Sequence, residues 1–247
     1  MLELFHGISS TCSQKVRLCL AEKNVRDWIS HPIDLASNEH LQSGFLAINP
    51  NGVVPALRVD GEVIVESTAI CEYLDEAFAP ACSLSPATVV GRAQMRAWLR
   101  YIDEVPSMAI RVPTFQGWIL PKYQRMSRAQ FDAFKLANPL RRPFLSRIDR
   151  QHGFSAEDQE IAHWQLEQSL QRMAKALAAS PWICGDHYGL ADICMLPLVV
   201  RMLDVGLGRL LEAVPAARSW YERATARASF VSAFPAGSRP FQATVSC

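Results

Sequence analysis

A dense group of hydroxyl and thiol side chains stands at the start of the first amphipathic segment, in GISSTCSQKVRLCLAEK (residues 7–23). The N-terminus of a helix carries unpaired N–H groups and a partial positive charge, so it stabilises an anion such as a thiolate. The hydroxyls of Ser10, Thr11 and Ser13 can donate hydrogen bonds to sulfur, and such bonds lower the pKa of a thiol. That sulfur can belong to Cys12 or to a ligand. The same hydroxyls can instead cap the helix, so this segment alone leaves both interpretations open.

A proline in NGVVPAL (residues 51–57) marks a second candidate site. Pro55 cannot donate to a sheet ladder, and the bond before a proline is where a cis peptide costs little. A cis Val54–Pro55 bond would turn the backbone of Val54 outward, where it can pair with an extended peptide ligand. An ordinary trans proline at a sheet edge is the alternative explanation.

A third candidate site is VEST (residues 65–68), where a helix opens directly after a strand. The Ser67 hydroxyl and the first free N–H groups suit a carboxylate, and Glu66 suits an ammonium group. Ser67 by itself can also be a plain N-cap. A thiol-stabilising helix, a partner for a peptide backbone and a site for an amino-acid head group thus occur in one chain. Together they describe glutathione, a γ-glutamyl tripeptide with a central cysteine.

Strand and helix patterns alternate over residues 1–80. Strand patterns at 2–7 and 28–35 flank the first helix, and an Asp-Gly pair at 60–61 joins two further strands as a hairpin before a last helical pattern. This order predicts a small α/β domain. Residues 81–90 lack periodicity, and we expect a linker there.

Helical periodicity dominates residues 91–247 and predicts an all-α domain. Two stretches place apolar side chains on one helix face: Met95, Trp98, Leu99 and Ile102, then Leu166, Leu170, Met173 and Leu177. An insertion at about 121–152 is rich in basic residues: Lys122, Arg125, Arg128, Lys135, Arg141, Arg142, Arg147 and Arg150. These bases form either a solvated helix face or a patch for an anionic ligand.

The composition restricts the partners and the compartment. The 25 Lys and Arg residues nearly balance the 24 Asp and Glu residues, so no overall field favours nucleic acid or a membrane. The longest apolar run, 193–200, is far shorter than the roughly 18 residues that span a bilayer. The seven cysteines form no C-x-x-C pair, which suits a reducing compartment, and we expect a cytoplasmic protein. Cys184 and His187 have no second ligand pair, so no metal site is expected.

Three motifs occur in the order typical of a known family: NPNGVVPAL (49–57), DGEVIVESTAICEYLDE (60–76) and LADI (190–193). On these motifs the chain resembles a glutathione S-transferase over essentially its whole length. The resemblance implies a thioredoxin-like N-terminal domain, a helical C-terminal domain, glutathione as co-substrate, a hydrophobic acceptor site between the domains, and a homodimer.

Two further residues take their expected roles from this resemblance. His40 lies in the connector at 36–48, where family members often place a polar or basic residue against the glycyl carboxylate of glutathione; a solvated loop histidine is the alternative. The late motif is normally Ser/Thr-x-x-Asp, an N-capping box. Here Gly189 replaces the hydroxyl residue, and Asp192 is expected to be structural.

The subclass is ambiguous because different segments resemble different members. SSTCSQKVR (9–17) resembles the zeta-class maleylacetoacetate isomerases and the reductive hydroquinone dehalogenases. By that match Ser10 contacts the glutathione sulfur, and Cys12 can resolve a glutathionyl adduct by thiol exchange. Segments of both domains instead resemble the bacterial β-etherases that cleave lignin-type aryl ethers: ESTAICEYLDEAF (66–78), RAQMRAWLRYIDE (92–104), the basic insertion and LADIC (190–194). By that match Ser13 is the active-site serine, so the choice between the two serines stays open.

The resemblance to β-etherases implies a displacement reaction. A glutathione thiolate attacks the carbon that bears an aryloxy group next to a ketone, and a phenolate leaves. An apolar slot must hold the aryl rings, and aromatic or apolar candidates for it are Trp98, Tyr101, Met108, Phe115, Trp118 and Tyr123, most of which we expect in the core. The alternatives are isomerase or dehalogenase chemistry through Cys12, and a non-catalytic protein that binds glutathione or another ligand.

Overall fold

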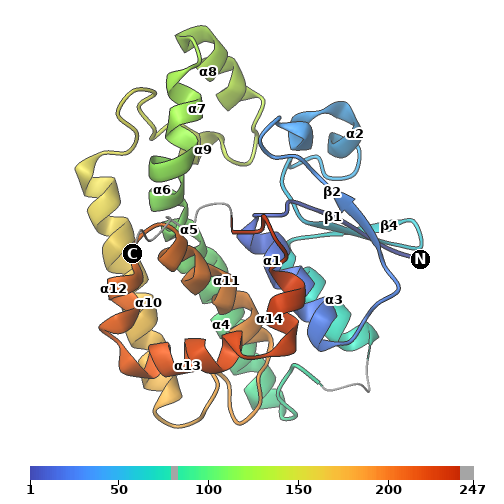
Figure 1. Cartoon of the computed structure of the whole chain (residues 1–247). Coiled ribbons are helices and arrows are strands. Elements are labelled where there is room, and N and C mark those ends of the chain that lie inside the picture. The colour runs from blue at the N-terminus through green and yellow to red at the C-terminus, as the bar shows by residue number, and fades with distance from the viewer. Residues whose placement is uncertain (79–82, 240–247) are drawn as a thin grey trace.

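The N-terminal part of the chain is a four-stranded mixed sheet with helices on both faces (Figure 1). The computed structural model describes residues 1–78 and 83–239. The strands are β1 (Leu2–His6), β2 (Ile29–Pro32), β3 (Ala56–Val59) and β4 (Glu62–Val65), in the order β2-β1-β3-β4. β1 is parallel to β2 and antiparallel to β3, which forms a hairpin with β4. The fold is the expected thioredoxin-like one.

Local chemistry explains these strands. Asp60 and Gly61 both have positive φ, 49° and 98°, as a two-residue hairpin turn requires, and the predicted hairpin is confirmed. Successive residues of a strand face opposite sides of the sheet. Leu4 therefore packs in the large core with α1 (Thr11–Glu22) and α3 (Ser67–Ala77). Phe5 packs on the other face, in a cluster that includes Phe45.

The short helices η1 (Glu39–Leu41) and α2 (Ser43–Leu46) connect β2 to β3. In residues 83–239 the elements that follow α3 are helices, as predicted. The helices are α4 (Val89–Glu104), α5 (Pro106–Ala109), α6 (Arg111–Thr114), π-helix η2 (Phe115–Ile119), α7 (Leu120–Gln124), α8 (Arg128–Leu136), α9 (Arg142–Leu145), α10 (Ala156–Leu177), α11 (Leu190–Asp204), α12 (Gly208–Glu212), α13 (Pro215–Thr225) and α14 (Ala228–Ala233). Residues 81 and 82 of the expected linker, and residues 240–247 of the expected helical domain, lie outside the described residues.

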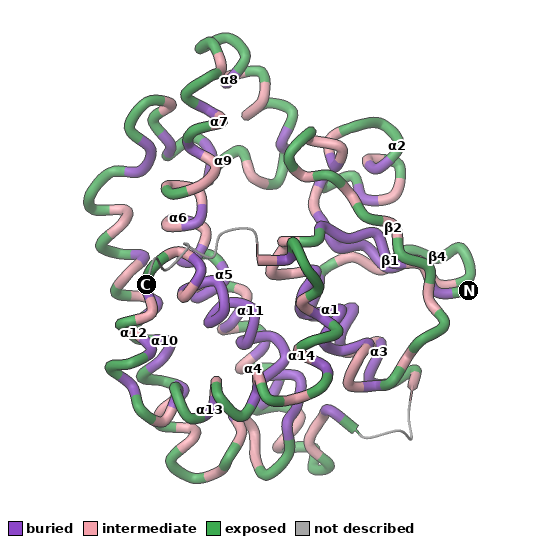
Figure 2. Tube along the Cα trace, viewed as in Figure 1, coloured by how far each residue is buried: buried purple, intermediate pink, exposed green. Residues whose placement is uncertain are grey.

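Helix α11 is the centre of the helical part, and almost all of it is buried (Figure 2). At its start, Asp192 accepts hydrogen bonds from the N–H groups of Ile183, Gly189 and Trp220, at 3.0, 3.1 and 2.7 Å. Asp192 is therefore structural, as expected. A Cβ on Gly189 would lie 2.6 Å from the carbonyl oxygen of Leu84. The hydroxyl residue usual at this position has no room here.

Helix α1 joins the two parts of the molecule. Buried Lys15 on α1 donates to the carboxylate of Asp103 on α4, at 2.7 Å. The C-terminal helix α14 returns to lie beside α1 (Figure 1), where Arg17 Nε donates to the carbonyl of Ala233 at 2.9 Å. Both contacts fix the start of α1 against helices that follow much later in the sequence. Among residues 1–78 and 83–239, no helix combines the length and hydrophobicity needed to cross a bilayer.

Candidate active site

The sheet topology gathers the three predicted motifs at one of its ends. The loop at 7–10 follows β1, residues 54–55 precede β3, and residues 66–67 follow β4. Because β3 is antiparallel to both β1 and β4, these three positions meet at the same end of the sheet. Gly7 confirms the closeness, since a Cβ there would lie 3.3 Å from a methyl group of Val54. Residues far apart in sequence therefore form one surface.

Ser10 and Ser13 take different positions at the start of α1. Ser10 is the N-cap: its oxygen accepts from the Ser13 N–H at 3.3 Å, and its own O–H stays available. Ser13 is fully buried, and its oxygen accepts from the Gly7 N–H at 3.2 Å. The N–H groups of Thr11 and Cys12 have no partner among the described residues. The first turn thus presents hydroxyl and N–H donors, with Ser10 at the surface of the site.

Two arginines hold the loop before α1 in place. Arg17 donates to the carbonyls of Gly7 and Ile8, at 3.3 and 2.8 Å. Arg201 on α11 donates to the carbonyl of Ser9 at 2.6 Å. Burial lowers the pKa of each guanidinium to about 10, which keeps both charged at neutral pH. These three hydrogen bonds fix the direction in which Ser10 enters the helix.

A cavity of about 420 Å³ opens beside this first turn. Its walls come from the α1 N-terminus, the connector after β2, and the helical segments α6 to α9 and α11. The lining residues are Ser9, Ser10, Thr11, Cys12, Leu35, Ala36, Asn38, His40, Ile110, Arg111, Thr114, Phe115, Trp118, Ile119, Lys122, Tyr123, Phe134, Asn138, Arg141, Leu145 and Arg201. The cavity therefore joins the N-terminal turn of α1 to an aromatic wall.

Only part of the predicted aromatic set faces this cavity. Phe115, Trp118 and Tyr123 line it, and the first two belong to the π-helix η2. Trp98 and Tyr101 instead pack edge to face on each other under the guanidinium of Arg172. Helical spacing marks one face of a helix but does not tell which face meets a cavity.

The connector after β2 closes the cavity on the side of the sheet. Lys122 on α7 donates to the Ala36 carbonyl and to the Asn38 side chain, both at 2.8 Å, and so ties the basic insertion to this connector. His40 lines the cavity and is buried, and its Nδ1 has no partner among the described residues. Desolvation, and then the charge of Arg141, lower the pKa of His40 to about 4. His40 is therefore neutral at pH 7.

The other predicted glutathione contacts lie at the same sheet end, outside the lining of this cavity. The Val54–Pro55 bond is cis, and within residues 1–78 and 83–239 nothing bonds the N–H or C=O of Val54. Glu66 is exposed and has a left-handed φ of 70°, which is unusual for a residue with a side chain. Ser67 is buried in the first turn of α3.

Three arginines are among the cavity residues that the sequence did not single out, and each was missed for a reason. Arg111 and Arg201 stand alone in apolar helices, where a single base gives no signal. Arg141 was counted in the basic insertion, and that enrichment was the available hint. Within the described part of the chain, no cluster of His, Cys, Asp or Glu side chains could hold a metal ion.

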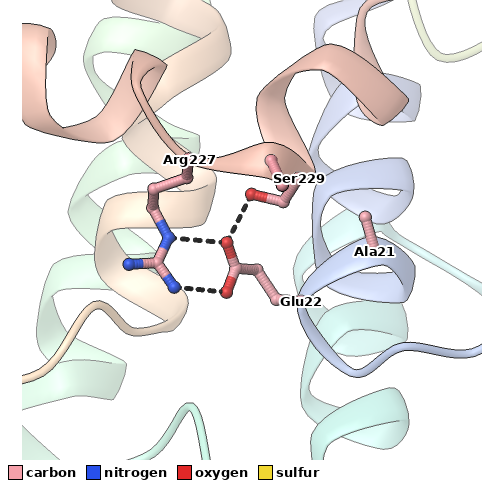
Figure 3. A pocket seen from close by; sticks show the side chains of 5 residues that line it. Ala21, Glu22, Arg227 and Ser229 are labelled. Atoms are coloured by element: carbon pink, nitrogen blue, oxygen red, sulfur yellow. Dashed lines mark hydrogen bonds and ion pairs between the residues drawn. The ribbon is translucent and has the colours of Figure 1, made fainter.

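A second hollow, of about 250 Å³, lies between α1 and the α13–α14 turn (Figure 3). The Glu22 carboxylate accepts two hydrogen bonds from Arg227, both 2.7 Å, and one from the Ser229 hydroxyl. Each charge in this hollow is satisfied by its neighbour. We interpret it as the joint that fastens α14 to α1 rather than as a binding site.

Comparison with known proteins and protein families identifies both the sheet-containing part and the helical part of the chain. Residues 9–77 match the model of the glutathione S-transferase N-terminal domain, and residues 159–223 match that of the C-terminal domain. The chain is 30% identical to Protein LigF of Sphingobium sp. strain SYK-6, over 84% of this chain and 83% of that protein. It is 31% identical to the maleylacetoacetate isomerase of Pseudomonas aeruginosa, over 95% and 96%.

One solved structure and one further sequence relative agree with these matches. The crystal structure of the β-etherase LigF from Sphingobium sp. strain SYK-6 superposes with a TM-score of 0.84 at 29% identity, covering 94% of this chain and 98% of that one. The tetrachloro-p-hydroquinone reductive dehalogenase of Sphingobium chlorophenolicum is 28% identical in sequence, over 94% of this chain and 95% of that protein.

Proposed function

Because the chain belongs to the glutathione S-transferase family, with glutathione as its co-substrate, we propose that it cleaves aryl ethers by thiolate displacement. The observation that carries this proposal is the cavity, which joins the first turn of α1 to the aromatic wall of η2. The overall similarity to the β-etherase LigF, at TM-score 0.84, supports the same reaction. The acceptor we propose is a β-aryloxy aryl ketone.

Glutathione would bind along the sheet end. The unpaired N–H and C=O of Val54 suit the cysteinyl backbone of the tripeptide. Glu66 and the first turn of α3 suit the γ-glutamyl ammonium and carboxylate. The unusual φ of Glu66 is consistent with a functional position, because such backbone conformations cluster at ligand sites. His40, neutral and with an unpaired ring nitrogen, can donate to the glycyl carboxylate.

The first turn of α1 would then hold the thiol as a thiolate. Ser10 donates its O–H to the sulfur, and the N–H groups of Thr11 and Cys12 add the positive end of the helix dipole. Ser13 supports this turn from below by accepting from Gly7. Ser10 rather than Ser13 is therefore our choice for the thiolate contact.

Phe115, Trp118 and Tyr123 would position the aryl rings of the acceptor beside the sulfur. The sulfur lone pair forms a C–S bond at the carbon next to the ketone, while the C–O bond to the aryloxy group breaks. The aryloxy group leaves as a phenolate and takes a proton from water. The products are a glutathione thioether and a phenol.

Mass spectrometry tests this reaction directly. A racemic β-aryloxy aryl ketone is incubated with glutathione and the protein, and phenol and thioether are quantified. We expect equimolar phenol and thioether. No phenol, in a preparation that binds glutathione by calorimetry, would overturn the ether-cleaving proposal.

A second candidate reaction uses the thiol of Cys12. This free cysteine lines the cavity next to Ser10, and the chain is similar to a reductive dehalogenase. The Cys12 thiolate would attack the sulfur of a glutathionyl adduct, forming a Cys12–glutathione mixed disulfide while the C–S bond to the substrate breaks and the substrate carbon takes a proton. A second glutathione would then reduce the mixed disulfide and release oxidised glutathione. The Cys12→Ala variant separates the two reactions: a displacement enzyme keeps most of its activity, whereas a reductive enzyme stalls at the glutathionylated product.

The pH dependence of thiolate absorbance separates an enzyme from a protein that only binds glutathione. Bound glutathione should ionise at lower pH than free glutathione if the α1 N-terminus stabilises its thiolate. A non-catalytic protein has no need of this stabilisation, so equal titration of bound and free thiol contradicts catalysis.

A further inference from the structure

The cavity is lined by four cationic side chains, and among the described residues by no acidic one. The four are Arg111, Lys122, Arg141 and Arg201. The net charge of the whole chain is only +1, so this local excess is not a property of the composition. Positive charge has been concentrated at one cavity.

The four cations differ in their partners. Lys122 and Arg201 are bonded to oxygen atoms of the connector and of the loop before α1, as described above. The guanidinium groups of Arg111 and Arg141 donate to no group in residues 1–78 and 83–239, and neither forms an ion pair there. A guanidinium presents five N–H donors and is costly to desolvate without acceptors.

The two unpaired arginines lie close enough to influence each other. Desolvation, and then the positive charge of Arg111, lower the pKa of Arg141 to about 10. Arg141 therefore remains charged at neutral pH. A planar anion placed between them would satisfy donors that otherwise lack partners and would remove their repulsion, and a carboxylate matches the forked geometry of arginine.

Their place in the fold joins both arginines to the aromatic wall of the cavity. Arg111 stands one turn before Phe115, and Arg141 directly precedes α9 and lies near Tyr123. Both therefore belong to the wall of the helical part where the acceptor would bind, and Arg141 also lies near Cys12 and His40. The same wall offers aromatic rings and unpaired guanidinium groups together.

We propose that Arg141, assisted by Arg111, binds a carboxylate carried by the aromatic acceptor, so that the enzyme selects acidic aryl ethers over neutral ones. This inference rests on the proposed function and deepens it, because it names the substrate class. His40 lies near Arg141, so the glycyl carboxylate of glutathione is a second source of the same chemistry. The experiments below distinguish the two sources.

The kinetic test compares two acceptors that differ in one group. Each is a β-aryloxy aryl ketone, and the leaving ring carries either a carboxylate or its methyl ester. We expect the native enzyme to show a higher kcat/KM for the acid. Arg141→Gln should reduce the ratio of acid to ester at least ~10-fold, because a hydrogen-bonded charge is lost. Arg111→Gln should reduce it less, and Arg141→Lys should restore part of it.

The neighbouring Arg142 supplies a matched control. It carries the same charge, it is exposed, and it does not line the cavity. Arg142→Gln should leave the acid-to-ester ratio unchanged. Equal losses on acid and ester in Arg141→Gln would overturn the proposal, because they would mean that Arg141 acts on the reaction and not on the substrate carboxylate.

A binding measurement separates this inference from the cleavage reaction. Calorimetry with para-phenoxybenzoate and with its amide, in protein saturated with glutathione, needs no turnover. We expect the acid to bind at least ~10-fold more tightly than the amide in the native protein and not in Arg141→Gln. If ether cleavage fails while this preference persists, the reaction is wrong and the carboxylate site stands. An unchanged preference combined with weaker glutathione binding in Arg141→Gln would assign Arg141 to glutathione and overturn the proposal.

Discussion

The two hollows described above are both lined by charged side chains, but only the smaller one satisfies those charges internally. In the smaller hollow, Glu22 is held by Arg227 and Ser229 (Figure 3). In the larger cavity, Arg111 and Arg141 have no acidic neighbour among the residues described. Paired charges fasten helices, whereas unpaired cations at a cavity leave donors available to an anionic ligand. The smaller hollow and the candidate active site therefore differ in whether their charges are paired and not in whether charges are present.

Breaking the ion pair in the smaller hollow should have the largest effect on the free energy of unfolding. Glu22→Ala leaves Arg227 and Ser229 without their acceptor, and we expect a loss of about 3 kcal/mol in the free energy of unfolding. Urea denaturation measures it, and kcat/KM should change little because this joint lies away from the cavity. Glu222→Ala breaks an exposed pair with Arg218 and should cost less than about 1 kcal/mol. Equal losses in both variants would contradict the comparison.

Removing the available donor at the α1 N-terminus should mainly affect catalysis. Ser10→Ala should lower kcat/KM about 100-fold, equivalent to about 2.7 kcal/mol, and raise the pKa of bound glutathione. Thiolate absorbance against pH measures that pKa. Ser13→Ala is the matched control, because its hydroxyl is buried against Gly7. A larger pKa increase in Ser13→Ala than in Ser10→Ala would reverse our assignment.

Protonation of His40, which adds a charge to the cavity, should lower the free energy of unfolding. The pKa of His40 is lowered from 6.5 to about 4, so the unfolded chain binds a proton first as the pH falls. His40 therefore contributes stability above about pH 6.5 that is lost towards pH 4. Between pH 7 and pH 5, we expect the free energy of unfolding to fall by about 2 kcal/mol less in His40→Gln than in the native protein. Urea unfolding at each pH measures this difference.

The exposed His187 provides the control for that pH experiment. His187→Gln should keep the native pH dependence over the same range. If His40→Gln keeps it as well, His40 is not buried as a neutral group in solution. Saturating glutathione should weaken the dependence in the native protein, since a bound carboxylate favours protonated His40.

Removing an unpaired charge from the cavity should have the smallest effect on the free energy of unfolding, and it should raise that free energy rather than lower it. Arg141→Gln should raise the free energy of unfolding by about 1 kcal/mol, because it removes a desolvated cation without an acceptor. The same variant should lose its preference for the acidic acceptor. A destabilised Arg141→Gln protein would mean that Arg141 has a structural role, and the contrast between the two hollows would fail.

Motifs with local chemistry were predictable from the sequence. The Asp-Gly turn at 60–61 needs residues that adopt positive φ, and the buried helix at 190–204 is apolar on every side. Asp192 belongs with them through its bond to the Gly189 N–H, three residues away, whereas its bond to Trp220 depends on the tertiary structure. These features depend on neighbouring residues, and the order of such elements was enough to predict both the thioredoxin-like part and the helical part.

The lining of the cavity depended on contacts between distant residues. Which serine faces the site was decided by Gly7, whose N–H bonds Ser13 and leaves Ser10 at the surface. The eight bases of the insertion look alike in sequence, yet Lys122 bonds the connector after β2 while Arg147 pairs with Asp158. No local pattern records such pairings, since each partner arrives from another element.

The sequence by itself therefore determined the elements and the family, and it supplied the residues that we propose to hold glutathione. The tertiary structure decided which side chains meet the cavity and which charges find partners there. The physical reason is that propensity and periodicity act over a few residues, whereas burial and charge pairing are set by the packing of whole helices. Arg141 illustrates both, as one base among eight in the sequence and an unpaired cation at an aromatic wall in the fold.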